Sequence, residues 1–546
     1  MLLTLLLSML LFAGSFLTTC YADNMETQQV LLRPDNPLWN LLELAGFGLL
    51  FCGCLYLYEK IGEKFRRGLL VFTLAFVFGL GILLILFGRT VPAADALSVY
   101  NAAAEWILGN TDIIHPTASY LSYYPQQIGL MAFLELLLRL WNLTGLSAPA
   151  WHFIKLVYVC LLCGAIWFQY LSLQYLWPEN YKKISCCYLI LVCCNLPMIM
   201  YSSFVYGEIP SFAALSVGWY LLLRLLDSAF LGSVSLGSAS LDSSYRDNVS
   251  RNDAPSVTAR GPAPHMLCRI IFTGFGSILF LTLSVMLRKN SLIPVIAVLL
   301  VLLFEALRPG RNGKMRLGLL IMAVCLAVTS VNVLPLTQKI YEKKAGNTLS
   351  SGVTAMSYLA MGMQEAPRGC GWYNGFNIDT YDTAGMDTAL ANEISRLAID
   401  ERLVYFREHP GYTADFYLHK HLSQWADGTY ASRQATLATY GGRSSFFKEV
   451  YEGSLSRGYI EWCNAWQNVL YLGVLVFCID SLKKRRESRV ADRLYVYVGL
   501  IAVLGGFLFH TFWEANSRYI FSYSLLLMPY CGAGVCTLLP PKRGHR

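Results

Sequence analysis

The sequence predicts an all-α polytopic membrane protein with about 11–13 transmembrane helices. Hydrophobic residues make up 55% of the chain and charged residues only 14%, against about 25% charged in average soluble proteins. The mean hydropathy is +0.45. Apolar runs of about 20 residues recur along the chain, and each is long enough to cross a hydrocarbon core of about 30 Å. These observations exclude an ordinary soluble domain, a collagen, a coiled coil and a disordered chain.

Residues 1–68 hold an apolar run at 1–19 and an extra span. The run has no Lys or Arg before it, so it lacks the n-region of a standard signal peptide. A retained anchor and a signal cleaved near Cys20–Ala22 both stay open. The predicted spans are 38–58, 69–88, 150–177, 184–201, 209–226, 269–287, 290–307, 317–336, 463–481, 493–513 and 519–537.

The run at 126–141 is short and carries Glu135 and Arg139 at helical i,i+4 spacing. We interpret it as an interfacial or re-entrant helix, because one more crossing would break the alternation of the basic loops. The alternative is that 150–177 hides a tight turn.

Basic clusters predict the orientation, because Lys and Arg gather in cytoplasmic loops. All five clusters fit one side, which accounts for the net charge of +8 without nucleic acid. The prediction is a multi-pass plasma-membrane protein whose segment 337–462 is extracytoplasmic. The clusters are Lys60–Arg67, Lys182–Lys183, Arg308–Arg316, Lys483–Arg489 and Lys542–Arg546.

The predicted organisation has four parts. The transmembrane core at 69–336 contains an outer loop at 89–125 and a Ser-rich cytoplasmic loop at 227–268, which we interpret as disordered. The segment 337–462 predicts a small, mainly helical outer domain, with helices at 385–408 and 412–426 separated by Pro410–Gly411. Residues 463–546 form the C-terminal helices and a basic tail. The 16 cysteines lie mostly in apolar runs, and no disulfide or zinc site is predicted.

Asp95 follows the outer end of the span at 69–88. A partly desolvated carboxylate at the membrane surface can accept a proton from a hydroxyl nucleophile. The alternative is a helix N-cap, because Asp95 precedes ALSVYNAAAEWIL, a good helix start. Both roles are compatible.

Glu208 lies in SSFVYGEIPSF, a very short turn between two apolar runs. A charge so close to hydrocarbon is costly unless it is used or paired. It is either a functional acid or a carboxylate that caps the span at 209–226.

His510, Glu514 and Arg518 recur at i,i+4 spacing in HTFWEANSRYIFSY. They face one way if the helix continues, and Arg518 could then bind a phosphate in bidentate fashion. The alternative is a Glu514–Arg518 pair that closes a helical hairpin.

Arg288 and Lys289 fall in an outer turn, against the positive-inside trend. This exception suggests an anionic partner such as a lipid phosphate, and the alternative is snorkelling to headgroups. Aromatic residues also gather on the outer side. They suit sugar rings or an interfacial belt, and they include Tyr120, Tyr123, Tyr124, Trp372, Tyr373, Trp425 and Tyr430.

Five features follow one another along the chain: Asp95, SYYPQQIG at 122–129, FVYGEIPSF at 204–212, LRKNSLI at 287–293 and EANSRYIFSY at 514–523. Together they resemble bacterial GT-C membrane glycosyltransferases, the group of the protein O-mannosyltransferases and lipid A aminoarabinose transferases. MGMQ…GWYNGF at 361–376 and KHLSQWADGTY at 420–430 are similar to the outer domain of that branch. The resemblance covers about 69–537.

The resemblance implies an inverting hexosyl- or pentosyltransferase of the cell envelope. Its donor is a sugar linked to polyprenyl phosphate, and its acceptor is an extracytoplasmic glycan, lipid or protein. Asp95 would be the catalytic acid of the first loop, and Glu208 matches the acid of the second. Arg518 and the Arg288–Lys289 turn would serve the donor phosphate. We place Glu514, His510, Tyr123, Tyr124 and Tyr206 with them as substrate-binding residues.

The chain departs from this family at Ala96, where many relatives carry a second acid beside the first. We therefore predict no bound metal or cofactor, with a divalent metal as the alternative. The competing function is a transporter, flippase or polymerase for lipid-linked glycans, which should show polar or broken helices near the bilayer midplane. Asn195–Pro197 and Asn332 are the positions to inspect.

Overall fold

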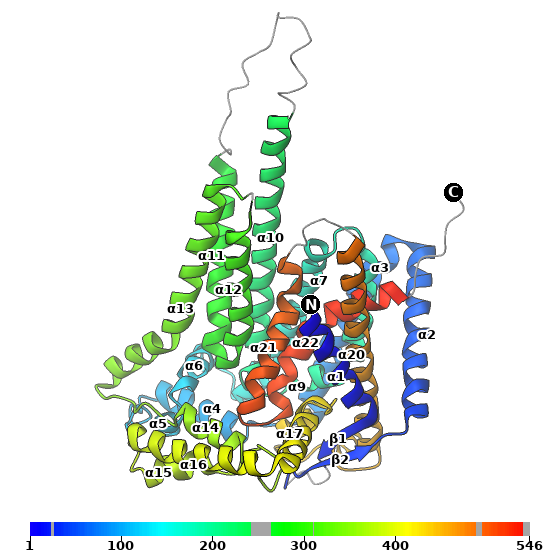
Figure 1. Ribbon diagram of the computed structural model, residues 1–546. Coiled ribbons are helices and arrows are strands. Elements are labelled where there is room, and N and C mark those ends of the chain that lie inside the picture. The colour runs from blue at the N-terminus through cyan, green and yellow to red at the C-terminus, as the bar shows by residue number, and fades with distance from the viewer. Residues whose placement is uncertain (23–26, 242–263, 310, 488–493, 539–546) are drawn as a thin grey trace, which may run out of the picture.

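The computed structural model describes residues 1–22, 27–241, 264–309, 311–487 and 494–538, and it is built almost entirely of helices (Figure 1). Within these ranges, ten helices are long and apolar enough to cross a membrane. The predicted all-α polytopic class is therefore confirmed. The ten are α2 (Pro37–Ile61), α3 (Glu63–Leu83) with its π-helical extension η1 (Leu84–Gly88), α7 (Ala150–Leu176), α10 (Glu208–Leu241), α11 (Pro264–Leu287), α12 (Leu292–Leu307) with η4 (Lys289–Ser291) before it, α13 (Gly313–Ala345), α20 (Leu455–Glu487), α21 (Val498–Phe512) after η5 (Leu494–Tyr497), and α22 (Ser517–Leu538).

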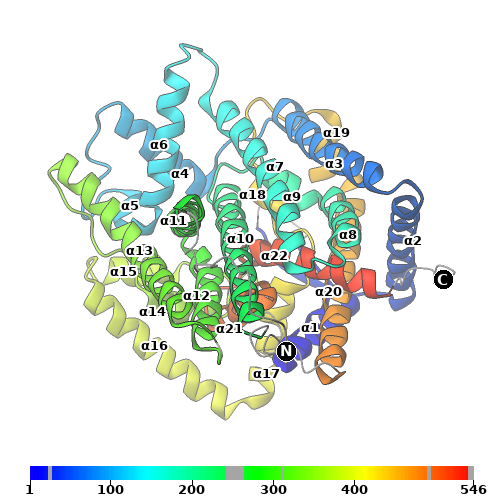
Figure 2. The same cartoon turned by 90° about the horizontal axis from the view of Figure 1, so that it is seen from above.

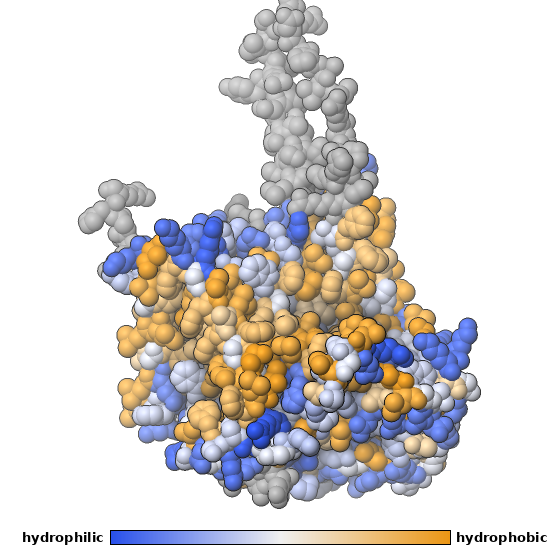
Figure 3. Space-filling model, turned by 180° about the vertical axis from the view of Figure 1, so that it is seen from behind, coloured by the Kyte–Doolittle hydropathy of each residue, from blue (hydrophilic) through white to orange (hydrophobic). Residues whose placement is uncertain are grey.

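The surface shows where these helices meet lipid. Figure 3 shows apolar residues across the middle of one face of the molecule, with hydrophilic residues gathered above and below them. Large apolar side chains point outward from the peripheral helices, such as Leu49 of α2, Phe72 of α3 and Val331 of α13. So large an apolar surface is unfavourable in water and suits a hydrocarbon environment.

The span predicted at 184–201 is not one helix. The chain forms α8 (Tyr181–Cys194) and the short α9 (Leu196–Tyr201), with a break at Asn195. The Asn195 Oδ1 accepts the backbone N–H of Met198 at 3.0 Å, and Pro197 occupies the first turn of α9. The amide side chain and the proline together start a new helix, so the predicted span at 184–201 is interrupted, and its crossing of the membrane stays a prediction.

Two predictions about the early spans have different outcomes. α7 is continuous, so the tight turn proposed inside 150–177 is wrong. α6 (Ile128–Asn142) has 15 residues, about 22 Å at 1.5 Å per residue, which is short for a crossing. Arg139 and Glu135 form the expected i,i+4 ion pair at 2.7 Å. Figure 2 shows α6 projecting to one side of the bundle, and its interfacial or re-entrant placement stays a prediction.

The N-terminal apolar run forms α1 (Leu2–Leu17) and continues into a hairpin of β1 (Thr18–Ala22) and β2 (Val30–Pro34). The strands are antiparallel, with Cys20 opposite Leu32. The sequence does not predict these strands, because five residues carry little periodicity. Their support is tertiary: the Cys20 backbone N–H donates to the Ala426 carbonyl at 3.0 Å.

The connecting segments that contain the predicted site residues gather at one end of the bundle, the lower end in Figure 1. The predicted helices at 385–408 and 412–426 are confirmed as α16 and α17, separated at His409. α13 continues beyond the predicted start of the outer segment at 337, past Pro335. The elements at this end are α4 (Ala94–Ile107), α5 (Tyr120–Tyr123), η2 (Pro125–Gln127), α14 (Ala355–Gly362), α15 (Phe376–Thr383), α16 (Thr388–Glu408), α17 (Pro410–Trp425), α18 (Ser432–Ala435) and α19 (Ser445–Tyr451).

The described basic clusters lie at the opposite end of the bundle, in the turns between α2 and α3, α7 and α8, and α12 and α13. Lys183 pairs with Glu59 across two of these turns at 2.7 Å. The loop predicted at 227–268 is helical at both ends, since α10 runs to Leu241 and α11 begins at Pro264. Its centre, 242–263, and the tail at 542–546 lie outside the described residues.

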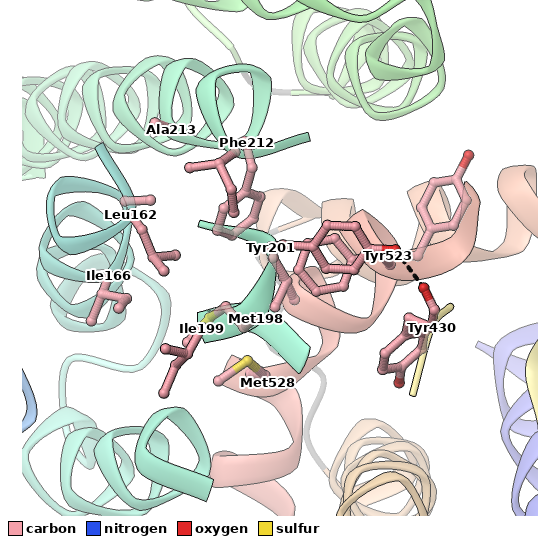
Figure 4. Close-up of a cluster of buried hydrophobic side chains, with 14 of the residues drawn as sticks. Leu162, Ile166, Met198, Ile199, Tyr201, Phe212, Ala213, Tyr430, Tyr523 and Met528 are labelled. Atoms are coloured by element: carbon pink, nitrogen blue, oxygen red, sulfur yellow. Dashed lines mark hydrogen bonds between the residues drawn. The ribbon is translucent and has the colours of Figure 1, made fainter. Parts of the chain in front are cut away.

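The buried core links these two ends. In Figure 4, Tyr201 of α9 lies against residues of α22 and donates its hydroxyl to the Tyr430 carbonyl. Its ring stacks on Phe521 with centroids 4.3 Å apart. An aromatic pair of this kind contributes about 0.5–1.5 kcal/mol beyond its buried area. The contact fixes the start of α22 against the turn at 426–431, which forms one wall of the site.

Candidate functional site

A cavity of about 380 Å³ lies at the lower end of the bundle. Its size is within the usual range for small-molecule sites, about 300–1,000 Å³. Six parts of the chain enclose it: the β1–β2 hairpin, the start of α4, the turn between α9 and α10, the loop before α15, the segment after α17 that contains α18, and the start of α22. The lining residues are Cys20, Tyr21, Ala22, Gln28, Val30, Ala93–Ala96, Phe204, Arg368, Trp372, Asp427, Ala431, Gln434, Ala435, Leu437, Ala438, Asn516, Ser517 and Arg518.

Asp95 lines this cavity from the first turn of α4. The N-cap of α4 is Ala93, and no side chain caps the helix, so the predicted capping role of Asp95 is wrong. Among the described residues, its carboxylate has no hydrogen bond or ion pair with another side chain. The preceding loop is fixed by the Val91 N–H, which donates to the Ala438 carbonyl at 2.9 Å. The carboxylate is therefore well placed and unengaged.

Arg518 lines the same cavity from the first turn of α22. The carbon of its guanidinium lies 5.7 Å from the ring centroid of Phe204, 5.6 Å from that of Tyr206 and 5.7 Å from that of Tyr519. Aromatic faces at this distance attract a cation. The start of α22 is held by Ser517, whose hydroxyl donates to Asp427 at 2.6 Å. These contacts fix where the guanidinium lies.

Glu208 does not line the cavity. It begins α10, its side chain is 3% exposed, and it forms ion pairs with both Arg288 and Arg518. The Arg518 Nε lies 3.7 Å from the Glu208 Oε1. The predicted short turns around Glu208, Arg288 and Arg518 therefore do meet in space, although only Arg518 reaches the cavity.

The predicted i,i+4 face of His510, Glu514 and Arg518 does not exist. α21 ends at Phe512, Trp513 has an extended backbone, and α22 starts at Ser517. His510 is fully buried, and neither ring nitrogen has a hydrogen-bond partner among the described residues. The helical spacing failed because the chain turns at the end of the membrane span.

Glu514 lies in that turn and accepts a hydrogen bond from the Tyr519 hydroxyl at 3.1 Å. Burial raises the pKa of Glu514 to about 7, while this hydrogen bond and the charge of Arg518 act in the opposite direction. Glu514 thus changes charge near neutral pH, next to the cavity.

The predicted tyrosines separate into two groups. Tyr206 is buried beside Arg518 and accepts a hydrogen bond from the Gln127 amide. The pKa of Tyr124 is raised by burial and then by the charge of Asp95, so Tyr124 lies near the site. Tyr123 instead donates to Asp382 of α15 at 2.8 Å, and Lys289 is exposed on its turn and does not line the cavity.

Three residues of the site were not predicted. Arg368 brings a second cation to the cavity, and Asp427 organises the turn after α17 by accepting the Thr429 N–H at 2.9 Å. Lys155 of α7 is buried and donates to the Thr90 carbonyl at 2.9 Å, which fixes the loop before Asp95. A lysine within an apolar run was the available signal for Lys155. For Arg368 the sequence offered none.

No group of three or more His, Cys, Asp or Glu side chains that could hold a metal ion occurs in the described part of the chain. The charged groups at the cavity are instead the carboxylate of Asp95, the guanidinium groups of Arg368 and Arg518, and the buried Asp427. This donor set suits a ligand that combines a hydroxyl group with an anionic group.

Comparison with protein-family models gives no match, and comparison with curated proteins gives none. Among solved structures, the chain is similar to the archaeal oligosaccharyltransferase AglB from Archaeoglobus fulgidus in complex with an inhibitory peptide and a dolichol-phosphate, with a TM-score of 0.44 and 13% identity over 88% of this chain and 51% of that chain.

It is also similar to the Archaeoglobus fulgidus oligosaccharyltransferase in complex with Zn and sulfate, with a TM-score of 0.43 and 12% identity over 86% of this chain and 49% of that one. The apo form gives a TM-score of 0.42 and 13% identity over 88% and 51% of the two chains. The chain spans about half the length of the solved chains that it matches.

Proposed function

We propose that this protein is a membrane glycosyltransferase of the GT-C type, which moves a sugar from a polyprenyl-phosphate donor to a hydroxyl acceptor on the extracytoplasmic side. One observation carries the proposal: the unengaged carboxylate of Asp95 and the guanidinium of Arg518 face one cavity at the end of a membrane bundle. A general base and a phosphate-binding cation are the two groups that this transfer needs.

In the proposed reaction, Asp95 accepts the proton of the acceptor hydroxyl. The hydroxyl oxygen then attacks the anomeric carbon, the bond from that carbon to the phosphate oxygen breaks, and polyprenyl phosphate leaves with the electron pair. A single displacement of this kind inverts the anomeric configuration. Arg518 stabilises the charge that develops on the leaving phosphate, since a guanidinium can donate two parallel hydrogen bonds to phosphate oxygens.

The aromatic residues near these groups have a consistent place in this scheme. Trp372 lines the cavity, and its indole N–H donates to the Ser423 hydroxyl at 2.8 Å. This contact orients the ring at the wall of the cavity. Tyr206 and Phe204 contact Arg518, and Tyr124 lies near Asp95. Of these rings, Trp372 and Phe204 line the cavity, where they could pack against the apolar face of a sugar.

The orientation in the membrane follows from the basic clusters. The described clusters share the end of the bundle opposite the cavity, and Lys and Arg favour the cytoplasmic side. We therefore place residues 337–462 outside the cytoplasm. Cysteines introduced into α16 should react with an impermeant thiol reagent on intact cells, and protection of that segment would reverse the orientation.

The test of the activity uses the purified protein in vesicles with a labelled sugar on polyprenyl phosphate. A membrane fraction from cells that lack the protein supplies the acceptor. We expect label to leave the donor lipid, with release of free polyprenyl phosphate. Lys339→Met, which removes an exposed charge on α13, is the control variant and should transfer label as the wild-type protein does.

A transporter would behave differently in the same vesicles. It would move the intact labelled lipid to the other leaflet without breaking the bond to phosphate. The break between α8 and α9 is the feature that favours this alternative, although its polar group is satisfied by the cap at Asn195. Flipping without cleavage would overturn the proposed activity.

A further inference from the structure

The carboxylate of Glu208 is buried between two arginines that come from different outer turns. Arg288 follows α11, and Arg518 begins α22. The side chains are 3% exposed for Glu208, 13% for Arg288 and 19% for Arg518. One carboxylate therefore offsets two guanidinium groups in a poorly solvated place, where charge pairs are strong and unpaired charges are costly.

The backbone around Glu208 holds this arrangement closely. A Cβ added at Gly207 would lie 2.6 Å from the Leu287 carbonyl oxygen, so only glycine allows the turn before α10 to approach the end of α11. The Ser211 hydroxyl donates to the Ser284 carbonyl at 2.9 Å. The position of Glu208 is thus fixed relative to α11 and to the turn that follows it.

The geometry leaves Arg518 with one free side. Its Nε faces Glu208, and three aromatic rings surround the guanidinium. The nearest approach of the guanidinium to Glu208 is through Nε, at 3.7 Å, so the terminal NH₂ groups lie farther from this carboxylate. Arg518 also lines the cavity, whereas Glu208 does not. Glu208 is therefore unable to reach an acceptor hydroxyl in this cavity directly, but it can orient the group that reaches the leaving phosphate.

We infer that Glu208 is a positioning residue whose carboxylate holds Arg518 toward the cavity, and that Arg288 completes this triad as a charge partner of Glu208 instead of binding the donor phosphate. The inference rests on the proposed function. Glu208 and Arg288 therefore do not act on the substrate in this scheme; they set the position of Arg518.

A charge-balance cycle tests it with Glu208→Gln, Arg288→Met and the double variant. Glu208→Gln leaves two buried cations beside each other, and we expect the turnover number to fall about 100-fold, as when one partner of a buried charge pair is lost. Arg288→Met leaves the Glu208 carboxylate paired with the Arg518 guanidinium, so the loss of turnover should be much smaller. The double variant restores the wild-type net charge of the triad, and it should recover at least tenfold over Glu208→Gln.

Two readouts separate positioning from proton transfer. If Glu208 only positions Arg518, the residual activity of Glu208→Gln keeps the wild-type shape of its pH profile, and the KM for the acceptor is unchanged. If Glu208 is itself the base, the acidic limb of the profile disappears and the double variant is as inactive as Glu208→Gln. That second result would overturn the inference.

Binding of undecaprenyl phosphate, measured without any sugar transfer, keeps this test distinct from that of the proposed function. We expect about tenfold weaker binding by Glu208→Gln and recovery in the double variant. If the wild-type protein transfers no sugar but the double variant still recovers binding, the proposed reaction is refuted and the triad is supported. Binding that is equally weak in Glu208→Gln and the double variant would overturn the triad itself.

Discussion

The two ends of the helical bundle each hold a buried glutamate between two arginines. At the cavity end, Glu208 pairs with Arg288 and Arg518. At the opposite end, the Arg308 guanidinium lies 3.5 Å from the Glu305 carboxylate, which also pairs with Arg311. The charges are the same and both carboxylates are almost fully buried. The chemistry of the side chains therefore does not distinguish the two clusters.

The surroundings of the two clusters distinguish them. Glu305 has a structural contact as well: its Oε1 accepts the backbone N–H of Leu494 at 3.2 Å and so ties the end of α12 to η5, which precedes α21. The cluster around Glu208 instead borders a cavity of about 380 Å³, and Arg518 belongs to both. Buried ion-pair networks also occur outside functional sites, so the residue that the Glu208 cluster shares with the cavity is what distinguishes it.

The largest expected effect on transfer comes from Asp95→Asn. The amide keeps the size of the side chain but cannot accept the proton, so activity should fall by roughly two orders of magnitude or more. The melting temperature should not change, since the described structure gives Asp95 no side-chain partner. Glu105→Gln on the exposed face of α4 is the matched control. Near-normal transfer by Asp95→Asn would mean that another group is the base.

Arg518→Lys should have the next largest effect. Lysine keeps the charge but loses the planar fork that can bind two phosphate oxygens together. We expect turnover about 100-fold lower, at the lower end of the roughly 100–1,000-fold loss that follows removal of one stabilising donor. Arg457→Lys, at a site whose side chain is 80% exposed, controls for the substitution. Unchanged donor affinity and turnover would remove Arg518 from the phosphate site.

Glu514→Gln should change transfer by a few-fold and should alter the dependence of stability on pH. Burial raises the pKa of Glu514 to about 7 from an ordinary value of 4.5. Between these values the folded protein binds more protons than the unfolded chain, so stability falls as the pH rises from about 4.5 to 7. Thermal unfolding across this range should lose that slope in Glu514→Gln. A persistent slope would assign the titration to another group.

Glu305→Gln should have the smallest effect on transfer and a clear effect on stability. It leaves two arginines without their carboxylate and should cost about 3 kcal/mol of folding free energy. The turnover number of the remaining folded protein should stay within about twofold of wild type, because this cluster lies at the end opposite the cavity. A loss of turnover equal to that of Glu208→Gln would show that the two ends do not differ in function.

The spans and the outer helices were largely predictable. Ten of the eleven predicted spans correspond to described helices that are long and apolar enough to cross a membrane, because length and hydropathy are local properties of the sequence. The helices at 388–408 and 410–425 followed from apolar periodicity and from Pro410. The eleventh span is interrupted at Asn195, whose side chain can either lie inside a helix or cap one. Local sequence does not decide between these outcomes.

The site was predictable only in part. Asp95 and Arg518 were expected at the outer end of their spans, and both line the cavity. The helical face of His510 and Glu514 was wrong because α21 ends at Phe512. Arg368 was missed because an arginine in a loop is ordinary until the loop is placed beside a cavity.

The sequence by itself determined that this chain is a helical membrane protein and which charged residues lie near the ends of its spans. Both follow from local hydropathy, which is a property of short segments. Only the tertiary structure decided that Glu208 pairs with Arg288 and Arg518, and that Asp95 shares a cavity with Arg518. Those residues are far apart in the chain, and their meeting depends on how α4, α10, α11 and α22 pack. Packing of this kind is fixed by the sum of many contacts, which no short motif records.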